Sequence, residues 1–283
     1  ILKLLAERIA GEVTEDLEDC LTKAESQDDF GQGVSFEDIK MWTTTKGAYA
    51  GSDNDMYIAI KSFIAYVAHF VKGGIQSRNL SAEARQGCRL LLPGQNVNYK
   101  PEDSDDSTCI DIGLVASKHD AVIELCIKPS YYRLRAVVEA KKGKKEGDLY
   151  DAFAQLCEYT RQMYAVQHNL RTVLGFTVCA SDIWIYHFGH SKTVASEPMD
   201  VTSPNGRRAF VELLVNMSLC DDSQLGRDPT MQHLPELRCW QIDCPDNSDD
   251  SSSSGVVSQY YFSNIICITD HLLGHRISCL LVI

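Results

Sequence analysis

The sequence lacks the features that mark secreted, disulfide-bonded and membrane-spanning proteins. Its 11 cysteines occur singly, without a Cys-x-x-Cys pair, and even the nearest two, Cys239 and Cys244, are not spaced as zinc ligands. An odd number of scattered cysteines is typical of free thiols in a reducing compartment, so we expect an intracellular protein, cytoplasmic or nuclear. The first ten residues carry no signal-peptide cleavage pattern, and no apolar run reaches the length of a membrane span, so no membrane partner is expected.

Positive charge is also scarce. The chain has 27 Lys and Arg against 39 Asp and Glu, a formal net charge of −12 and a pI of about 5.1. This balance argues against broad electrostatic binding to nucleic acid, which requires a basic surface. One local exception is a lysine-rich stretch that comprises Lys141, Lys142, Lys144 and Lys145. Both DNA and a partner protein therefore stay open as partners.

The most informative stretch that is present is an apolar run that ends in Glu-x-Lys, Val137-Val138-Glu139-Ala140-Lys141. Side chains alternate faces along a strand, so Glu139 and Lys141 are predicted to point to the same side. A second strand candidate, Cys109–Val115, carries Asp111. Asp, then Glu-x-Lys, then a helix is the order of elements in the PD-(D/E)XK nuclease-like core. Asp111 and Glu139 could equally be strand-end acids in an ordinary α/β sheet.

The chemistry of such a core assigns a role to each of these residues. Asp111 and Glu139 would supply two oxygen ligands to Mg²⁺, the one cofactor that the pattern suggests, with the Ala140 carbonyl as a third. Lys141 would orient the attacking water or stabilise developing negative charge. Gln155 lies four residues before Tyr159, so both share one helix face, as in the Q-x-x-x-Y pattern of RecB-type nucleases. The alternative is a core-facing tyrosine with a surface glutamine.

The periodicity predicts an α/β (α+β) fold with a mixed central sheet flanked by helices. Amphipathic or apolar spacing predicts helices over 1–23, 56–72, 147–167 and 206–219, with Gly73-Gly74 ending the second. Strands are predicted at 89–92, 108–115, 121–128, 133–139, 171–179, 182–188, 259–269 and 276–283, with a turn at 117–120 and a hairpin link at Ala180-Ser181. The glycine-punctuated segment between the first two helices reads as loop-rich.

Composition shifts divide the chain into four predicted units. Residues 1–54 form an N-terminal helical region and residues 55–242 form the nuclease-like α/β domain. Residues 243–258 form an acidic, serine-rich linker, which we expect to bury little apolar surface, and residues 259–283 form a C-terminal β-hairpin.

Residues 134–230 resemble a segment of the fungal-type protein kinase family. That family carries a strand ending in E-x-K and a tyrosine-rich helix running into A-x-Q. Next come an R-x-V-L-G-F-T strand, a hairpin to an aromatic strand, an S-x-P-x-D stretch and L-G-x-D-P-T. The corresponding residues here are 137–141, 159–167, 171–177, 183–186, 196–200 and 225–230, in the same order. In the family this segment precedes the kinase core and resembles a PD-(D/E)XK-like module.

The resemblance implies three readings of function. The first is the accessory, nuclease-like region of a fungal-type protein kinase, truncated at the start of the kinase small lobe and without the kinase catalytic residues in this chain. The hairpin at 259–283 would then be an incomplete small lobe. The second reading is a Mg²⁺-dependent PD-(D/E)XK-type DNA endonuclease or phosphodiesterase that uses Asp111, Glu139, Lys141 and Gln155. The third is a non-catalytic protein-interaction module.

Overall fold

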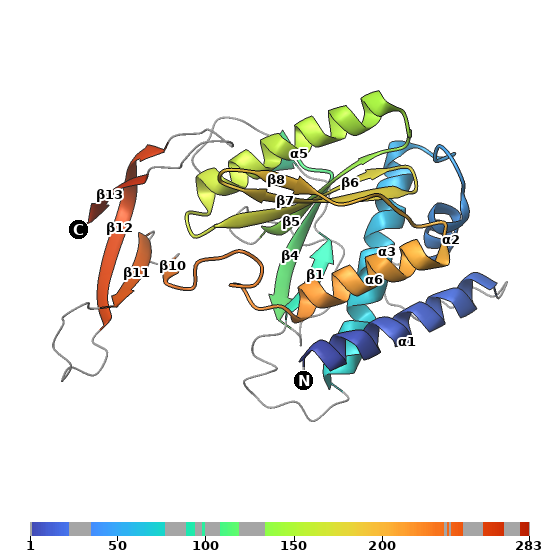
Figure 1. Ribbon diagram of the computed structural model, residues 1–283, viewed down its shortest axis with the longest axis horizontal. Helices are drawn as coiled ribbons and strands as arrows, with labels where there is room; N and C mark the ends of the chain where they lie inside the picture. Colours follow the sequence, from blue (N-terminus) through green and yellow to red (C-terminus); the bar gives the residue numbers. More distant parts are fainter. Residues whose placement is uncertain are drawn as a thin grey trace.

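The structure is a computed structural model, and it describes residues 2–22, 35–76, 89–93, 98–99, 108–118, 134–234, 237, 239–245, 257–268 and 278–282. Its centre is a seven-stranded mixed sheet in the order β1-β4-β5-β6-β7-β8, with β9 paired to β7 (Figure 1). Only β5 and β6 are parallel among these pairs, as expected for strands joined by a crossover helix. The strands are β1 Arg89–Pro93, β4 Ile112–Lys118, β5 Leu134–Lys141, β6 Thr172–Cys179, β7 Asp182–Gly189, β8 Thr193–Ala195 and β9 Met199–Asp200.

Helices cover both faces of this sheet (Figure 1). The crossover helix α5, Glu146–Val166, lies on one face, where Leu156 and Met163 pack among the side chains of β5 and β6. On the other face lie α1 Leu2–Thr22, α2 Phe36–Thr44, α3 Asp53–Gln76 and α6 Pro204–Leu219. The mixed sheet between helices confirms the predicted α/β fold class. Along β5, Ala136, Val138 and Ala140 face the larger helical layer, so Glu139 and Lys141 fall on the α5 side.

The helix α3 has the length and the apolar composition of a membrane span, a feature that we did not expect from the sequence. Of the most apolar 18-residue window of α3, 67 % is buried inside the protein, as in the core helix of a globular domain. The helix also continues to Gln76, so the prediction that Gly73-Gly74 ends it is wrong. A Cβ at Gly74 would lie 2.7 Å from Ile9 Cδ1, so this glycine allows α1 to approach α3 closely.

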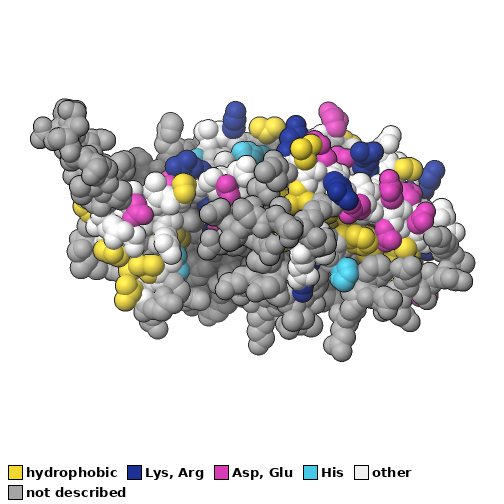
Figure 2. Space-filling view, turned by 90° about the horizontal axis from the view of Figure 1, so that it is seen from below, with side chains coloured by type: hydrophobic (Ala, Val, Ile, Leu, Met, Phe, Trp, Pro, Cys, Tyr) yellow, Lys and Arg dark blue, Asp and Glu magenta, His cyan; other side chains and the backbone are white. Residues whose placement is uncertain are grey.

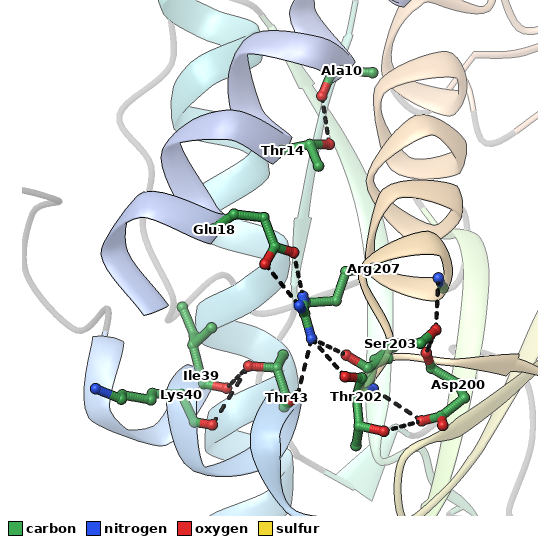
Figure 3. A network of polar contacts seen from close by, with 12 residues as sticks. Ala10, Thr14, Glu18, Ile39, Lys40, Thr43, Asp200, Thr202, Ser203 and Arg207 are labelled. Carbon is green, nitrogen blue, oxygen red and sulfur yellow. Dashed lines mark hydrogen bonds and ion pairs between the residues drawn. The ribbon is translucent and has the colours of Figure 1, made fainter. Parts of the chain in front are cut away.

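A buried arginine joins the N-terminal helices to the rest of the domain (Figure 3). Arg207, on α6, is 6 % exposed and forms two bonds of 2.7 and 2.8 Å to the Glu18 carboxylate on α1. Its third nitrogen donates to the carbonyls of Thr43, Val201 and Thr202 at 3.3, 3.1 and 2.9 Å. Residues 2–22 therefore share a core and a polar anchor with the sheet domain, while the proposed boundary at residue 54 stays a prediction.

The chain after α6 forms a second, antiparallel sheet in the order β10-β11-β12-β13, beside the main sheet in Figure 1. Its strands are β10 Met231–Leu234, β11 Cys239–Pro245, β12 Val257–Ile268 and β13 Ser278–Val282. The last two were predicted, whereas β10 and β11 were not. Trp240 of β11 contacts His168 beyond the end of α5 with ring centroids 5.3 Å apart, so the small sheet is attached to the main domain.

Several predicted boundaries are wrong. The predicted strand 108–115 is broken: β3, Thr108–Cys109, pairs with β2, Asn98–Tyr99, and β4 begins only at Ile112. The break has a cause, because the Asp111 carboxylate accepts the Ala140 N–H at 3.0 Å and takes the place of a main-chain ladder bond. The strand β4 then runs to Lys118 through its pairing with β1, beyond the predicted start of the turn at 117.

The segments predicted to be loop and linker contain regular structure as well. The loop-rich stretch includes α2, whose first turn is capped by Ser35 and whose buried face carries Ile39 and Trp42. The predicted linker is wrong at its ends, because Asp243 and Cys244 pair with Gln259 and Ser258 in the small sheet. The middle of that linker and the predicted strand at 121–128 lie outside the described residues.

We predict that Arg207→Met lowers the free energy of unfolding by about 2–4 kcal/mol, because it leaves three carbonyls and the Glu18 carboxylate without their donor. Urea unfolding followed by circular dichroism measures this loss. Arg208→Met is the matched control, since the side chain of Arg208 is 63 % exposed and pairs only across one helix turn with Glu212; its cost should stay below about 0.5 kcal/mol. Equal losses in the two variants would contradict the anchoring role.

Candidate functional site

The four residues predicted to carry chemistry come together around the carboxyl end of β5. Asp111 directly precedes β4, and Glu139 and Lys141 lie at the carboxyl end of β5. Gln155 projects from α5, where Tyr159 lies one turn further along. The antiparallel pairing of β4 with β5 sets Ile112 opposite Val138, which brings Asp111 beside the end of β5.

The polar contacts of this group, named here the Asp111–Glu139 cluster, satisfy each carboxylate from several elements. Lys141 Nζ donates to Glu139 Oε1 at 2.6 Å and to Gln155 Oε1 at 3.3 Å. The Tyr159 hydroxyl donates to Glu139 Oε2 at 3.0 Å. Glu139 and Lys141 thus share one side of β5, as strand alternation predicts, and both Gln155 and Tyr159 contact the cluster, as the Q-x-x-x-Y spacing suggested.

The two carboxyl groups also lie close enough to affect each other's ionisation. Both are nearly inaccessible, with Asp111 8 % and Glu139 1 % exposed. Burial raises the pKa of both groups; the charge of Asp111 adds to the rise at Glu139, whose pKa reaches about 8. Burial alone would lower the pKa of Lys141, but its hydrogen bond to Glu139 and the nearby carboxylates outweigh burial and raise it.

The sequence reasoning missed Tyr57, which lies in the first turns of α3. The pKa of Tyr57 is raised, first by burial and then by the charge of nearby Asp111. The apolar pattern of α3 predicted a buried helix and gave no sign that one of its tyrosines reaches the carboxylates. The cluster therefore joins β4, β5, α3 and α5.

The donor set fits a divalent cation only in part. Two carboxylates that cannot both ionise without a neighbouring positive charge are a suitable pair of oxygen ligands for Mg²⁺. Among the described residues, however, no three His, Cys, Asp or Glu side chains gather as metal ligands, so most of the six positions around Mg²⁺ would fall to water and substrate. Because Glu139 is 1 % exposed and both of its oxygens accept hydrogen bonds, a metal would have to replace existing contacts.

The lysines beside the cluster differ from one another. Lys142, Lys144 and Lys145 are exposed at the turn that leads into α5. Lys144 is engaged in an ion pair with Asp182 at 2.8 Å, while Lys145 is the N-cap residue of α5. Main-chain contacts fix this turn from outside, since Ala180 N–H donates to the Lys141 carbonyl at 2.7 Å and Tyr49 N–H to the Lys142 carbonyl at 2.9 Å.

One comparison with known proteins identifies a relationship. A sequence-family model described as fungal protein kinase matches residues 110–282. No curated protein and no solved structure matches the chain. The matched segment contains Asp111, Glu139, Lys141 and Gln155, and it confirms the family resemblance that the motifs gave. Tyr57 and the helices α1–α3 lie before it.

We predict that Glu139→Gln weakens the pH dependence of stability between about pH 5 and pH 8. The folded protein keeps a proton on Glu139 up to about pH 8, whereas the unfolded chain releases it near 4.5. Stability therefore falls as pH rises through this window, by up to about 1.4 kcal/mol per pH unit from this group, and then levels off. The amide of the variant cannot titrate, so urea unfolding at several pH values should give a shallower slope for Glu139→Gln than for the wild type.

The control for this measurement is Glu212→Gln, since Glu212 is a surface residue whose ion pair with Arg208 spans one helix turn. Its slope should equal that of the wild type. Parallel slopes for the wild type and Glu139→Gln would show that Glu139 is ionised in the folded protein at pH 6–7.

Proposed function

The chain belongs to the fungal protein kinase family, and within it we propose that residues 1–283 form a nuclease-like accessory region that does not itself transfer phosphate. Kinase chemistry needs a phosphate-binding lysine, a catalytic aspartate in a His-Arg-Asp-type loop and a metal-binding aspartate. The printed sequence contains no His-Arg-Asp triplet, in the matched segment or elsewhere. An intracellular location, cytoplasmic or nuclear, is part of this proposal.

The observation that carries the proposal is the closed state of the Asp111–Glu139 cluster. Each Glu139 oxygen already has a donor, Asp111 accepts the Ala140 N–H, and both carboxyl groups are buried. A group held in this way fixes β4, β5 and α5 relative to one another. The nuclease-like arrangement would then serve as a rigid platform beside the small sheet, and its surface would meet a partner protein.

We predict that this chain transfers no phosphate from ATP. The purified protein, incubated with γ-labelled ATP, Mg²⁺ and a generic acceptor such as myelin basic protein, should give no labelling above a heat-denatured sample. Labelling above that sample would contradict the proposal, and labelling that Glu139→Ala and Asp111→Ala leave unchanged would assign it to a kinase centre outside the cluster.

A second function is favoured by one specific observation: Lys141 and Gln155 lie beside the paired carboxylates in the order that the PD-(D/E)XK pattern requires. In this alternative the protein is a Mg²⁺-dependent phosphodiesterase that acts on DNA. Bound Mg²⁺ would polarise the scissile phosphate and lower the pKa of a water molecule. Asp111 and Glu139 would hold the metal, Lys141 would stabilise the charge that develops on the phosphate, and Gln155 would position the Lys141 ammonium.

The nuclease alternative predicts Mg²⁺-dependent cleavage of linear DNA that Glu139→Ala reduces by at least about 100-fold, since a metal ligand is lost. Gel electrophoresis of end-labelled duplex and single-stranded DNA measures the rate. Glu158→Ala is the control on the neighbouring helix, because Glu158 pairs with Arg161 rather than with the cluster. Cleavage that persists in Glu139→Ala would come from a contaminant. If the wild type cleaves no DNA, the nuclease alternative is contradicted and the accessory region remains the proposal.

A DNA substrate also requires a basic contact surface. On the face shown in Figure 2, Lys and Arg side chains lie among Asp and Glu side chains rather than in one continuous stretch. Of the exposed lysines that follow the cluster in sequence, Lys144 pairs with Asp182, which leaves Lys142 and Lys145 as the candidate phosphate contacts. If they meet phosphates, Lys142→Ser with Lys145→Ser should lower the slope of log K against log salt by about 2 in a fluorescence-anisotropy assay. Lys3→Ser with Lys192→Ser removes the same charge elsewhere and should leave the slope near that of the wild type.

A further inference from the structure

A second charged cluster lies apart from Asp111 and Glu139, where the segment after α6 returns to the start of β5. Its central residue, Arg227, belongs to the Leu225–Thr230 motif and is 7 % exposed. One terminal nitrogen of Arg227 donates to the Leu134 carbonyl at 2.8 Å and also to the Gln167 side chain. Gln167 in turn donates to Leu134, so this end of the guanidinium is fully used in holding α5 and β5 together.

The other side of the Arg227 guanidinium is not satisfied in the same way. Its Nε is buried and has no hydrogen-bond partner, and the nearest carboxylate oxygen, Asp222 Oδ1, is 4.0 Å away. That same oxygen lies 2.9 Å from a terminal nitrogen of Arg135. Asp222 therefore forms a close ion pair with Arg135 but is too far from Arg227 Nε for a hydrogen bond. A buried donor without an acceptor is costly, and the cost is greater when the donor carries charge.

The two arginines also repel each other. Burial, and next the positive charge of Arg135, lower the pKa of Arg227 to about 9, while Asp222 acts in the opposite direction. Asp222 itself is half exposed, on a surface turn, whereas the Arg135 side chain is 12 % exposed. Among the described residues, the half-exposed Asp222 carboxylate thus faces both guanidiniums from the solvent side.

We propose that Arg135 and Arg227 form a binding site for a phosphate monoester dianion, in which Asp222 is the intramolecular group that the phosphate displaces. A phosphate carries up to twice the charge of a carboxylate and three acceptor oxygens, so one oxygen can face Arg135 while another reaches Arg227 Nε. Planar guanidiniums are the side chains best suited to this contact. The dianion has two sources, a free small phosphate or a phosphorylated side chain, and both present the same chemistry to the arginines.

The test uses the full chain and the variant Asp222→Asn, which removes the displaceable charge at a half-exposed position. Inorganic phosphate should bind Asp222→Asn about tenfold more tightly than the wild type, measured by isothermal titration calorimetry at pH 7.5 and constant ionic strength. A phosphoserine peptide titrated in parallel distinguishes the sources. Tighter binding of the peptide than of inorganic phosphate assigns the site to a phosphorylated protein, and equal or weaker binding assigns it to small phosphates.

Two further variants make the result specific. Asp222→Asn with Arg135→Gln should lose the phosphate affinity gained in Asp222→Asn; Arg135 is chosen because Arg227 anchors Leu134 and Gln167 and its replacement risks unfolding. The pair Arg171 and Asp228 is the matched control, since Arg171 is 63 % exposed and Asp228→Asn likewise removes a carboxylate from an arginine. Phosphate affinity in Asp222→Asn no greater than in Asp228→Asn would overturn the proposal, with circular dichroism confirming that both variants are folded.

Discussion

The shared burial of two carboxyl groups is the constraint on which the central part of this structure depends. Glu139 sits at 1 % exposure in the middle of a sheet, where an isolated carboxylate would be strongly disfavoured. It is tolerated because Lys141 and Tyr159 donate to it and because burial and the Asp111 charge raise its pKa, which favours the uncharged acid. Lys141 lies on β5, Tyr159 on α5, and Asp111 directly before β4. The unfavourable free energy of burying Glu139 is therefore offset only when these three elements are all in place.

The same constraint explains which residues of the cluster could be predicted from the sequence and which could not. The apolar run into Glu139 and the alternation at Lys141 predicted their common side, and the four-residue spacing placed Gln155 and Tyr159 toward them. Asp111 was identified as a candidate from the sequence. Its hydrogen bond from the Ala140 N–H, which interrupts the strand, was not predicted, because a bond from a single side chain does not change the periodicity of the sequence. Tyr57 was missed because its helix is apolar on nearly every side.

Long-range packing accounts for the remaining differences. Nothing local in the sequence indicates that Gly74 lies against Ile9, or that Trp42 of a short helix donates to the Ala180 carbonyl at 2.8 Å across the domain. The strand β10 was missed because it has only four residues, and β11 because its partner β12 is separated from it along the chain. The fold class and the longer helices and strands could be predicted from the periodicity of apolar residues. The close packing at Gly74, the Trp42 hydrogen bond and the small sheet depend on contacts that only the folded chain makes.

The geometry of the Asp111–Glu139 cluster bears directly on the choice between platform and enzyme. A metal-dependent nuclease needs its carboxylates both paired and reachable, because water and the scissile phosphate must complete the coordination sphere. Here Asp111 and Glu139 lie close enough to affect each other's ionisation, but both oxygens of Glu139 already accept hydrogen bonds and the residue is almost wholly buried. Conversion to a metal site would require Tyr159 or Lys141 to release Glu139, and each release costs a hydrogen bond in a buried setting. These costs favour the closed arrangement and so support the proposed platform over the nuclease alternative.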